Sequence, residues 1–174
     1  MSIKVVNHYY PSYDTVKSKQ TLTYEELMTT KKPGIHKVVK PIKCYKKAGV
    51  LPKWQHNINI LHKNRYKFRD VIVEMTIPVG ATIIRPETNC ESWAKLRASS
   101  AKIEKIYSID DNMNINDFPY ENPICFSRYS HGFIYEIGKT VKPLEPLNKF
   151  VECECGSGIH FFLTPEETQD YDFS

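Results

Sequence analysis

The sequence predicts an α+β fold, a mostly antiparallel sheet of short strands with a short N-terminal helix and a capped C-terminal helix. Eleven prolines divide the 174 residues into short segments. Several of these segments place apolar residues at every second position, which is the pattern of a strand. Parallel strands need long crossover connections, so the short connections seen here favour antiparallel pairing.

The length fits one domain with an extension. We expect a basic N-terminal extension with a short helix in residues 1–42 and a single α+β domain in residues 43–174. Residues 1–70 carry 15 basic and 4 acidic side chains, whereas residues 71–174 carry 9 basic and 16 acidic ones. This asymmetry indicates either an acidic partner or the solvated surface of a lysine-rich chain.

The first elements are predicted from a helix cap and a proline. Thr23 and Glu26 have the spacing of a capping box and open a short helix that ends by residues 32–34. Residues 36–45 are predicted as an edge strand, because Pro41 cannot donate to a central ladder. Residues 46–67 show no clear period and are predicted as a long loop or irregular turns.

The clearest strand covers residues 70–77 and ends at a Pro-Val-Gly turn. Residues 81–85 are predicted to return beside it as its neighbour. One helical turn is expected over residues 92–97. Residues 101–109 alternate as a strand before a polar loop at 110–114.

The C-terminal third is predicted as short strands followed by a helix. The strands cover residues 133–137, 140–141 and 158–163. Thr164 precedes Pro165 and two glutamates, which is a capping threonine with proline at the first helical position. The helix is expected to run to about residue 171.

Two features of the sequence indicate where in the cell the protein is found. No apolar run approaches the ~18–20 residues that span a membrane, and residues 1–14 lack the pattern of a signal peptide. The five cysteines are an odd number without regular spacing, which fits a reducing compartment. We therefore expect an intracellular protein with no membrane span.

A zinc site could be sought at Cys153, Cys155 and His160, with Cys125 and His131 as further ligands. A single residue between two cysteines is fewer than the two to four of the usual zinc knuckle, and alternation on an extended chain directs the two sulfurs to opposite faces. We therefore expect no metal. A cysteine–histidine nucleophile from the same residues would need a lowered thiol pKa, for which the sequence has no local signature.

The N-terminal half interleaves basic and aromatic residues, as single-stranded nucleic-acid binding requires. The residues that would bind a nucleic acid or another polyanion are Lys43, Lys46, Lys47, Lys53, Trp54, Lys63, Arg65, Lys67 and Arg69. Lysines outnumber arginines here, and a lysine is a point charge without the fork that reads base edges. Any such binding is expected to depend on charge and not on sequence.

A glycine-rich segment near the C-terminus introduces an enzymatic alternative. The run from Gly156 to Tyr171 resembles the G-x-G-I-Y-F-A segment, helix and tyrosine of poly(ADP-ribose) polymerases and related ADP-ribosyltransferases, with His160 in place of the first tyrosine. In that family the glycines let a strand approach nicotinamide and a tyrosine stacks on it. The resemblance implies an NAD-using transferase whose site would contain Arg128, His131, His160 and Tyr171.

Two further motifs, Y-E-x-G-K-x-V at residues 135–141 and C-x-x-G-I-H-F-F at residues 155–162, carry a broader resemblance. Residues 43–171 resemble an uncharacterised domain of large DNA viruses and of bacterial and phage proteins, often fused to pentapeptide repeats. The resemblance implies a viral origin and no established activity. This chain adds a second cysteine, Cys153, and has no pentapeptide repeat.

The acid and base candidates form no convergent group in the sequence. We therefore expect a virus-encoded, non-enzymatic interaction or virion module without a cofactor, which binds a viral or host protein in the host cytoplasm or in the virion. The alternatives are the ADP-ribosyltransferase-like enzyme and the nucleic-acid-binding protein. His160 is expected to support the fold, because a histidine on a short apolar strand needs hydrogen-bond partners.

Overall fold

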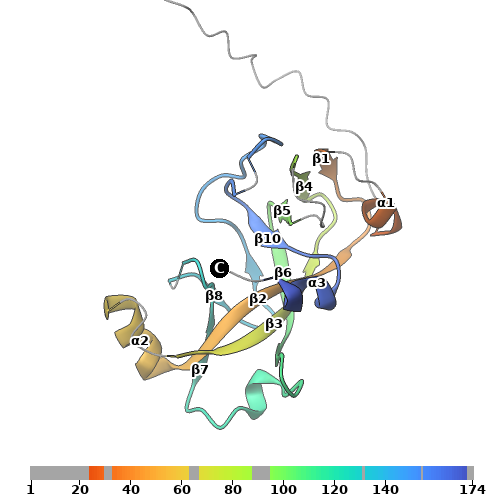
Figure 1. Ribbon diagram of the computed structural model, residues 1–174. Coiled ribbons are helices and arrows are strands. Elements are labelled where there is room, and N and C mark those ends of the chain that lie inside the picture. The colour runs from red at the N-terminus through yellow and green to blue at the C-terminus, as the bar shows by residue number, and fades with distance from the viewer. Residues whose placement is uncertain are drawn as a thin grey trace, which may run out of the picture.

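The protein folds into two antiparallel sheets with a few short helices, which confirms the predicted α+β class (Figure 1). The computed structural model describes residues 24–29, 33–62, 67–87, 95–130, 132–153 and 155–171. Among these residues no helix is long and apolar enough to cross a membrane.

The larger sheet has six strands. Its strands in spatial order are β8 (Ile134–Tyr135), β7 (Pro123–Phe126), β2 (Ile42–Pro52), β3 (Arg69–Ile77), β6 (Ala101–Ser108) and β9 (Thr140–Val141). The long strands β2 and β3 pair from Ile42 opposite Ile77 to Val50 opposite Arg69. The ladder between β3 and β6 shifts register at Glu74, as a bulge does.

The smaller sheet has four strands. They are, in spatial order, β1 (Gly34–Lys37), β4 (Thr82–Arg85), β5 (Leu96–Ala98) and β10 (Ile159–Phe161). The two sheets touch where β10 ends, because Tyr45 and Phe162 exchange backbone hydrogen bonds of 2.9 and 2.8 Å. This bridge brings β10 alongside the first half of β2.

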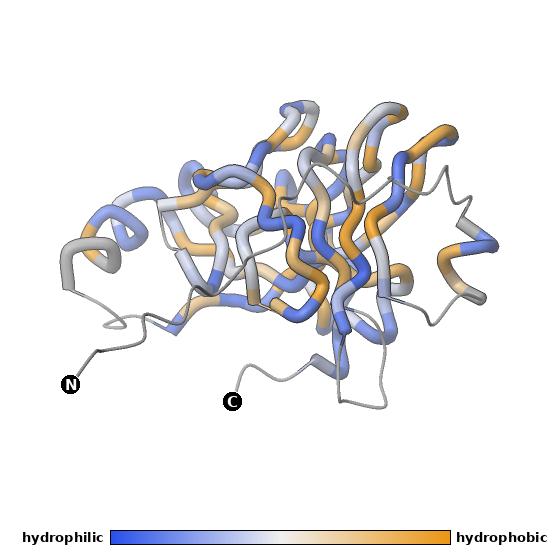
Figure 2. Tube along the Cα trace, turned by 90° about the horizontal axis from the view of Figure 1, so that it is seen from above, coloured by the Kyte–Doolittle hydropathy of each residue, from blue (hydrophilic) through white to orange (hydrophobic). Residues whose placement is uncertain are grey.

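Three α-helices and one 3₁₀ turn complete the described chain. They are α1 (Tyr24–Thr29), α2 (Lys53–His62), η2 (Ile115–Asp117) and α3 (Pro165–Asp170). At α3 the predicted capping box is confirmed, because Thr164 Oγ1 accepts from the backbone of Glu167, whose carboxylate accepts from Thr164 N. Helices α1 and α2 lie at opposite ends of the molecule in both views (Figures 1 and 2).

The core is built from alternate residues of both sheets. On β2, Ile42, Cys44, Ala48 and Val50 are buried on one face, as the period of two requires. Leu27 of α1 is also fully buried in this core. Figure 2 shows the apolar residues along the strands in the middle of the molecule.

The prediction of a loop over residues 46–67 is wrong. Strand β2 continues to Pro52, and helix α2 follows at once. The prediction that the strand from residue 36 lies at a sheet edge holds for β1 only, because Pro41 lies outside both strands and β2 is central. Lys46 interrupts an otherwise apolar face, and this hid the alternation that extends to Val50.

Two further elements differ from the predictions. Strand β4 does not return beside β3 but pairs with β1 and β5 in the other sheet. The turn at Val79 and Gly80 redirects the chain, with Gly80 at φ +85° and its N–H bonded to Val38 O. The end of the expected helical turn, at Leu96 and Arg97, is strand β5, whose side chains are all buried.

The segment predicted as an extension contributes to the packed structure. Strand β1 pairs with β4, and Leu27 belongs to the core. A division at residue 42 therefore separates α1 and β1 from the residues against which they pack. The expected helix is present as α1, whereas its predicted cap, Thr23, lies outside the described residues.

Candidate binding pocket

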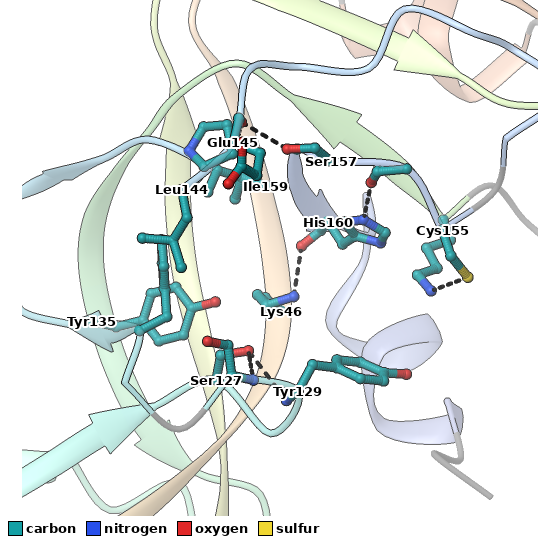
Figure 3. Close-up of a pocket in the computed structure, with 16 residues that line it drawn as sticks. Lys46, Ser127, Tyr129, Tyr135, Leu144, Glu145, Cys155, Ser157, Ile159 and His160 are labelled. Atoms are coloured by element: carbon teal, nitrogen blue, oxygen red, sulfur yellow. Dashed lines mark hydrogen bonds between the residues drawn. The ribbon is translucent and has the colours of Figure 1, made fainter. Parts of the chain in front are cut away.

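The candidate site lies where one edge of β2 changes its neighbour. Strand β3 pairs with one edge of β2 from Ile42 to Val50. Along the opposite edge of β2, Tyr45 is bridged to Phe162, which follows β10, whereas residues 49–52 pair with β7. The two neighbours diverge around Lys46, and a pocket of about 340 Å³ opens between them (Figure 3).

The pocket walls are mostly apolar and come from several segments that are distant in the sequence. The lining residues are Lys46, Lys95, Ser127, Tyr129, Ser130, Phe133, Tyr135, Pro143, Leu144, Glu145, Cys155, Gly156, Ser157, Gly158, Ile159 and His160. Such a volume and such walls, with a few polar groups between them, are typical of sites for small ligands.

Lys46 projects into the pocket from the core-facing side of β2. It is 9% exposed, and its Nζ donates to the backbone oxygen of His160 at 3.2 Å. Burial, and after it the positive charge of Lys95, lowers the pKa of Lys46 to about 8. Figure 3 shows its amine between His160 and the wall that contains Tyr135 and Leu144.

Lys95, immediately before β5, supplies a second ammonium group. It is 7% exposed, and its Nζ lies 3.3 Å from the hydroxyl of Tyr171 and 3.8 Å from Cys155 Sγ. The same atom stands 5.7 Å from the ring centre of Tyr129 and 5.5 Å from that of Tyr171. The aromatic faces partly stabilise its charge without neutralising it.

Neither ammonium group has a carboxylate within 4.0 Å in the part of the chain that the structure describes. Glu145 lines the pocket but is exposed. Buried charges in proteins are usually paired. Among the described residues, no nearby carboxylate therefore balances these two nearly buried lysines, which repel each other.

His160 forms part of the wall opposite Tyr135. Its Nε2 lies 2.8 Å from the carbonyl oxygen of Gly156. Burial, and after it the charge of Lys46, lowers the pKa of His160 to about 4, so the ring is neutral at pH 7 and Nε2–H donates. This half-buried histidine supports the turn before β10; its effect on stability stays a prediction.

Arg97 explains why glycines occupy positions 156 and 158, between Cys155 and Ile159. It is fully buried and donates to the carbonyl oxygens of Asn148 at 2.6 Å, Phe150 at 2.8 Å and Ser157 at 3.1 Å. A Cβ at Gly156 would lie 2.7 Å from Arg97 Nη1, and one at Gly158 would lie 2.9 Å from Arg97 Cβ. The glycines make room for this arginine, which fixes the pocket wall.

Two of the four residues proposed for a transferase meet at the pocket. His160 lines it, and the hydroxyl of Tyr171 is 3.4 Å from that of Tyr129. Arg128 lies in another cluster, with its guanidinium 5.1 Å from the ring centre of Phe68. His131 is outside the described residues.

Several of the residues proposed for polyanion binding contact other parts of the chain. Lys43 pairs with Glu74 at 3.1 Å, and Arg69 pairs with Asp111 at 2.7 Å. Lys47 is near the carbonyl oxygens of Gln169 and Tyr171, at the end of α3. Lys46 is nearly buried in the pocket, whereas the other described members, Lys53, Trp54 and Lys67, are exposed. Lys63 and Arg65 lie outside the described residues.

Metal ligands do not gather in the described part of the chain. There, no group of three or more His, Cys, Asp or Glu side chains could hold a metal ion. Cys44 and Cys125 are buried thiols of the core, and burial raises the pKa of both. Cys153 and Cys155 are also free thiols.

Fold and site together define an α+β domain with a cationic pocket at a fork in its sheet. Residues 39–168 match the family of unknown function DUF5758, and the chain belongs to that family. It is 28% identical to "Uncharacterized protein L227" of Acanthamoeba polyphaga mimivirus, over 91% of this chain and 94% of that protein. It is 37% identical to "Uncharacterized protein L223" of the same virus, over 58% of this chain and 61% of that protein.

These similarities confirm the predicted resemblance to an uncharacterised viral domain. No solved structure matches the chain. Sequence reasoning included Lys46 among surface cations and did not single out Lys95. A lysine at the centre of an alternating apolar stretch is the signal for Lys46, whereas Lys95 becomes visible only once the fold brings it to Tyr171.

Proposed function

We propose that this domain is a non-enzymatic viral recognition module and that its pocket binds the carboxylate of a viral or host protein. The observation that supports this is the pair of nearly buried lysines, Lys46 and Lys95, without a carboxylate partner among the described residues. An incoming anion would supply the missing charge. The complex would act in the infected cell or in the virion.

The residues that line the pocket also restrict which groups can accompany the carboxylate in the ligand. Phe133, Leu144 and Ile159 provide apolar walls, and Tyr129 and Tyr135 provide aromatic ones. A side chain or chain end that carries a carboxylate next to an apolar group fits both features. Glu145 at the wall would repel a second negative charge placed beside it.

Benzoate is a minimal probe of this proposal, because it joins a carboxylate to a flat apolar ring. We expect nuclear magnetic resonance titration to show a dissociation constant of about 1 mM, roughly −4 kcal/mol. The largest shifts are expected at Lys46, Tyr129 and Ser157. Benzamide, which has the same shape without the charge, is expected to bind at least tenfold more weakly.

Matched variants separate the pocket from general charge. Lys46→Met and Lys95→Met should each weaken benzoate binding at least tenfold. Lys43→Met changes a lysine of the same strand whose side chain points to the other face, and it should leave binding unchanged. Equal binding of benzoate and benzamide, or shifts outside the pocket only, would refute the proposal.

The ADP-ribosyltransferase hypothesis is a second candidate because His160 lines the pocket and Tyr171 contacts Tyr129, another lining residue. If it holds, the wild type should release nicotinamide from NAD, and His160→Ala should abolish that release without a change in melting temperature. A protein that leaves NAD intact during prolonged incubation excludes this alternative. The recognition proposal does not require NAD turnover.

A further inference from the structure

Lys46 differs from an ordinary surface lysine in its surroundings. Its neighbours on the buried face of β2 are Cys44 and Ala48, two small and fully buried side chains, whereas Lys46 itself lines the pocket. Its Nζ donates a hydrogen bond to the carbonyl oxygen of His160. The amine therefore reaches the pocket interior while most of its stem is enclosed.

The two lysines of the pocket are not equivalent. Lys95 is held between the rings of Tyr129 and Tyr171, where the aromatic faces favour a positive charge. No ring of the described residues stacks on Lys46 in this way, and burial together with the charge of Lys95 brings its pKa to about 8. About half of Lys46 is then neutral at pH 8, against less than about 1% of an unperturbed lysine. A neutral amine is a nucleophile.

We propose that Lys46 is a carbonyl-reactive amine and that the pocket takes small aldehyde acids or oxo acids, whose carboxylate Lys95 holds while the carbonyl carbon meets Lys46 Nζ. This is a covalent capability of the same pocket. It rests on the proposed function only in assigning the anion to Lys95. The ligand class is a small molecule with a carboxylate, an apolar body and a carbonyl group.

The step balances without a further reagent. The lone pair of Lys46 Nζ forms a bond to the carbonyl carbon, the C=O π bond breaks, and the oxygen takes one of the two protons of the attacking nitrogen to give a carbinolamine. The hydroxyl then leaves as water, with the second proton coming from the same nitrogen, and a C=N bond remains. No oxidant or reductant takes part.

The walls of the pocket favour the product of this step. Ile159 is buried and Lys46 itself is only 9% exposed, which limits the access of water to the amine, and water is what returns an imine to amine and carbonyl. The volume of about 340 Å³ accommodates a single aromatic ring with its substituents. 4-Formylbenzoate combines carboxylate, ring and aldehyde and is therefore the probe of choice.

The test traps the imine by reduction. The full chain is incubated with 4-formylbenzoate and cyanoborohydride at pH 8, and the modified lysines are mapped by peptide mass spectrometry. We expect Lys46 to be labelled about tenfold faster than any exposed lysine, Lys43 included. Benzaldehyde, which lacks the carboxylate, should label Lys46 at least tenfold more slowly.

Two variants complete the design. Lys46→Arg should lose the fast adduct, and Lys95→Met should slow it because the anion is no longer held. Labelling spread evenly over exposed lysines in the wild type overturns the inference, whatever the variants do. If benzoate binds in the pocket but Lys46 is not labelled, the covalent inference fails and the recognition proposal stands. If benzaldehyde and 4-formylbenzoate label Lys46 equally, the inference that Lys95 holds the carboxylate is wrong.

Discussion

Two regions of this domain place cationic side chains against aromatic rings. They differ in whether a described carboxylate lies close to the cation. In the first region, Arg69 lies 4.6 Å from the ring centre of Phe118 and 2.7 Å from Asp111. Arg128 lies over Phe68 in the same way, with Asp70 at 3.5 Å. This arginine cluster contains its own counter-charges.

The pocket repeats the cation–aromatic contact, with no carboxylate within 4.0 Å of its lysines among the described residues. Lys95 stands over two tyrosine rings, and Lys46 lies near enough for the two charges to repel. Both lysines are less exposed than Arg69. The comparison teaches that the arginine cluster is complete as a structural element, whereas the proposed function requires the pocket to gain free energy when an anion enters.

The largest expected effect tests whether the buried charge of Lys46 lowers the stability of the folded protein. Lys46→Met should stabilise the protein at pH 7, because burial and Lys95 disfavour the charged amine in the folded state. A pKa near 8 instead of 10.5 corresponds to about 3 kcal/mol, and the lost hydrogen bond to His160 subtracts about 1 kcal/mol. The net gain, about 2 kcal/mol, is measured by urea denaturation.

The pH dependence of this variant sharpens the test. The pKa of Lys46 is lowered on folding, so between about pH 8 and 10.5 the unfolded chain binds more protons and the wild type gains stability as pH rises. The advantage of Lys46→Met should therefore shrink across that window. A variant that is less stable than the wild type at pH 7 would contradict this account.

The second effect concerns the wall of the pocket. His160→Ala removes the hydrogen bond to Gly156 and should cost about 1–2 kcal/mol, a fall of roughly 2–8 °C in melting temperature. The pKa of His160 is lowered to about 4, so the wild type should lose stability as pH falls from about 6.5 toward 4. The variant should not show this pH-dependent loss of stability. An unchanged melting temperature would show that His160 does not support the fold.

The arginine cluster should respond in the opposite direction from the pocket. Arg69→Met removes a contact with Phe118 and an ion pair with Asp111, and should destabilise the protein by about 1 kcal/mol. The loss should decrease in high salt, because Asp111 is exposed. Thermal denaturation at two salt concentrations measures the loss of stability and its salt dependence. If Arg69→Met stabilised the protein, the two regions would not differ in the way described.

The smallest effect is expected on nucleic-acid binding. Exposed Lys53, Trp54 and Lys67 remain candidates for weak polyanion contact. Affinity for a generic single-stranded oligonucleotide should fall roughly tenfold or more between 50 and 200 mM salt if several phosphates are neutralised. Lys53→Ala should weaken it and Lys46→Met should not. Absence of binding at low salt, measured by fluorescence anisotropy, would exclude the hypothesis.

Local patterns predicted the elements whose causes lie within a few residues. The capping box at Thr164 and the alternation over residues 70–77 both correspond to observed elements. The pairing of β4 with β1 and not β3 could not be predicted, because it depends on where the turn at Gly80 directs the chain. Sheet membership is set by contacts between distant segments.

The pocket was predictable only in fragments. His160, Tyr171 and Lys46 attracted attention in the sequence, each for a different reason, and Lys46 was interpreted as an exposed cation. Its burial follows from the length of β2, which runs past the residue where its apolar pattern is broken. Lys95 had no local signal, because its partners Cys155 and Tyr171 are 60 and 76 residues away in sequence.

The tight fit between Arg97 and Gly156 has a consequence for how chains of this family can diverge. A side chain at position 156 would meet the guanidinium of residue 97 and Asn148 Cβ, at 2.7 and 3.0 Å. The two positions should therefore change together, a larger residue at 156 being acceptable only beside a shorter one at 97. A relative that keeps the arginine but has lost the glycine is expected to route this loop differently and to lack the pocket.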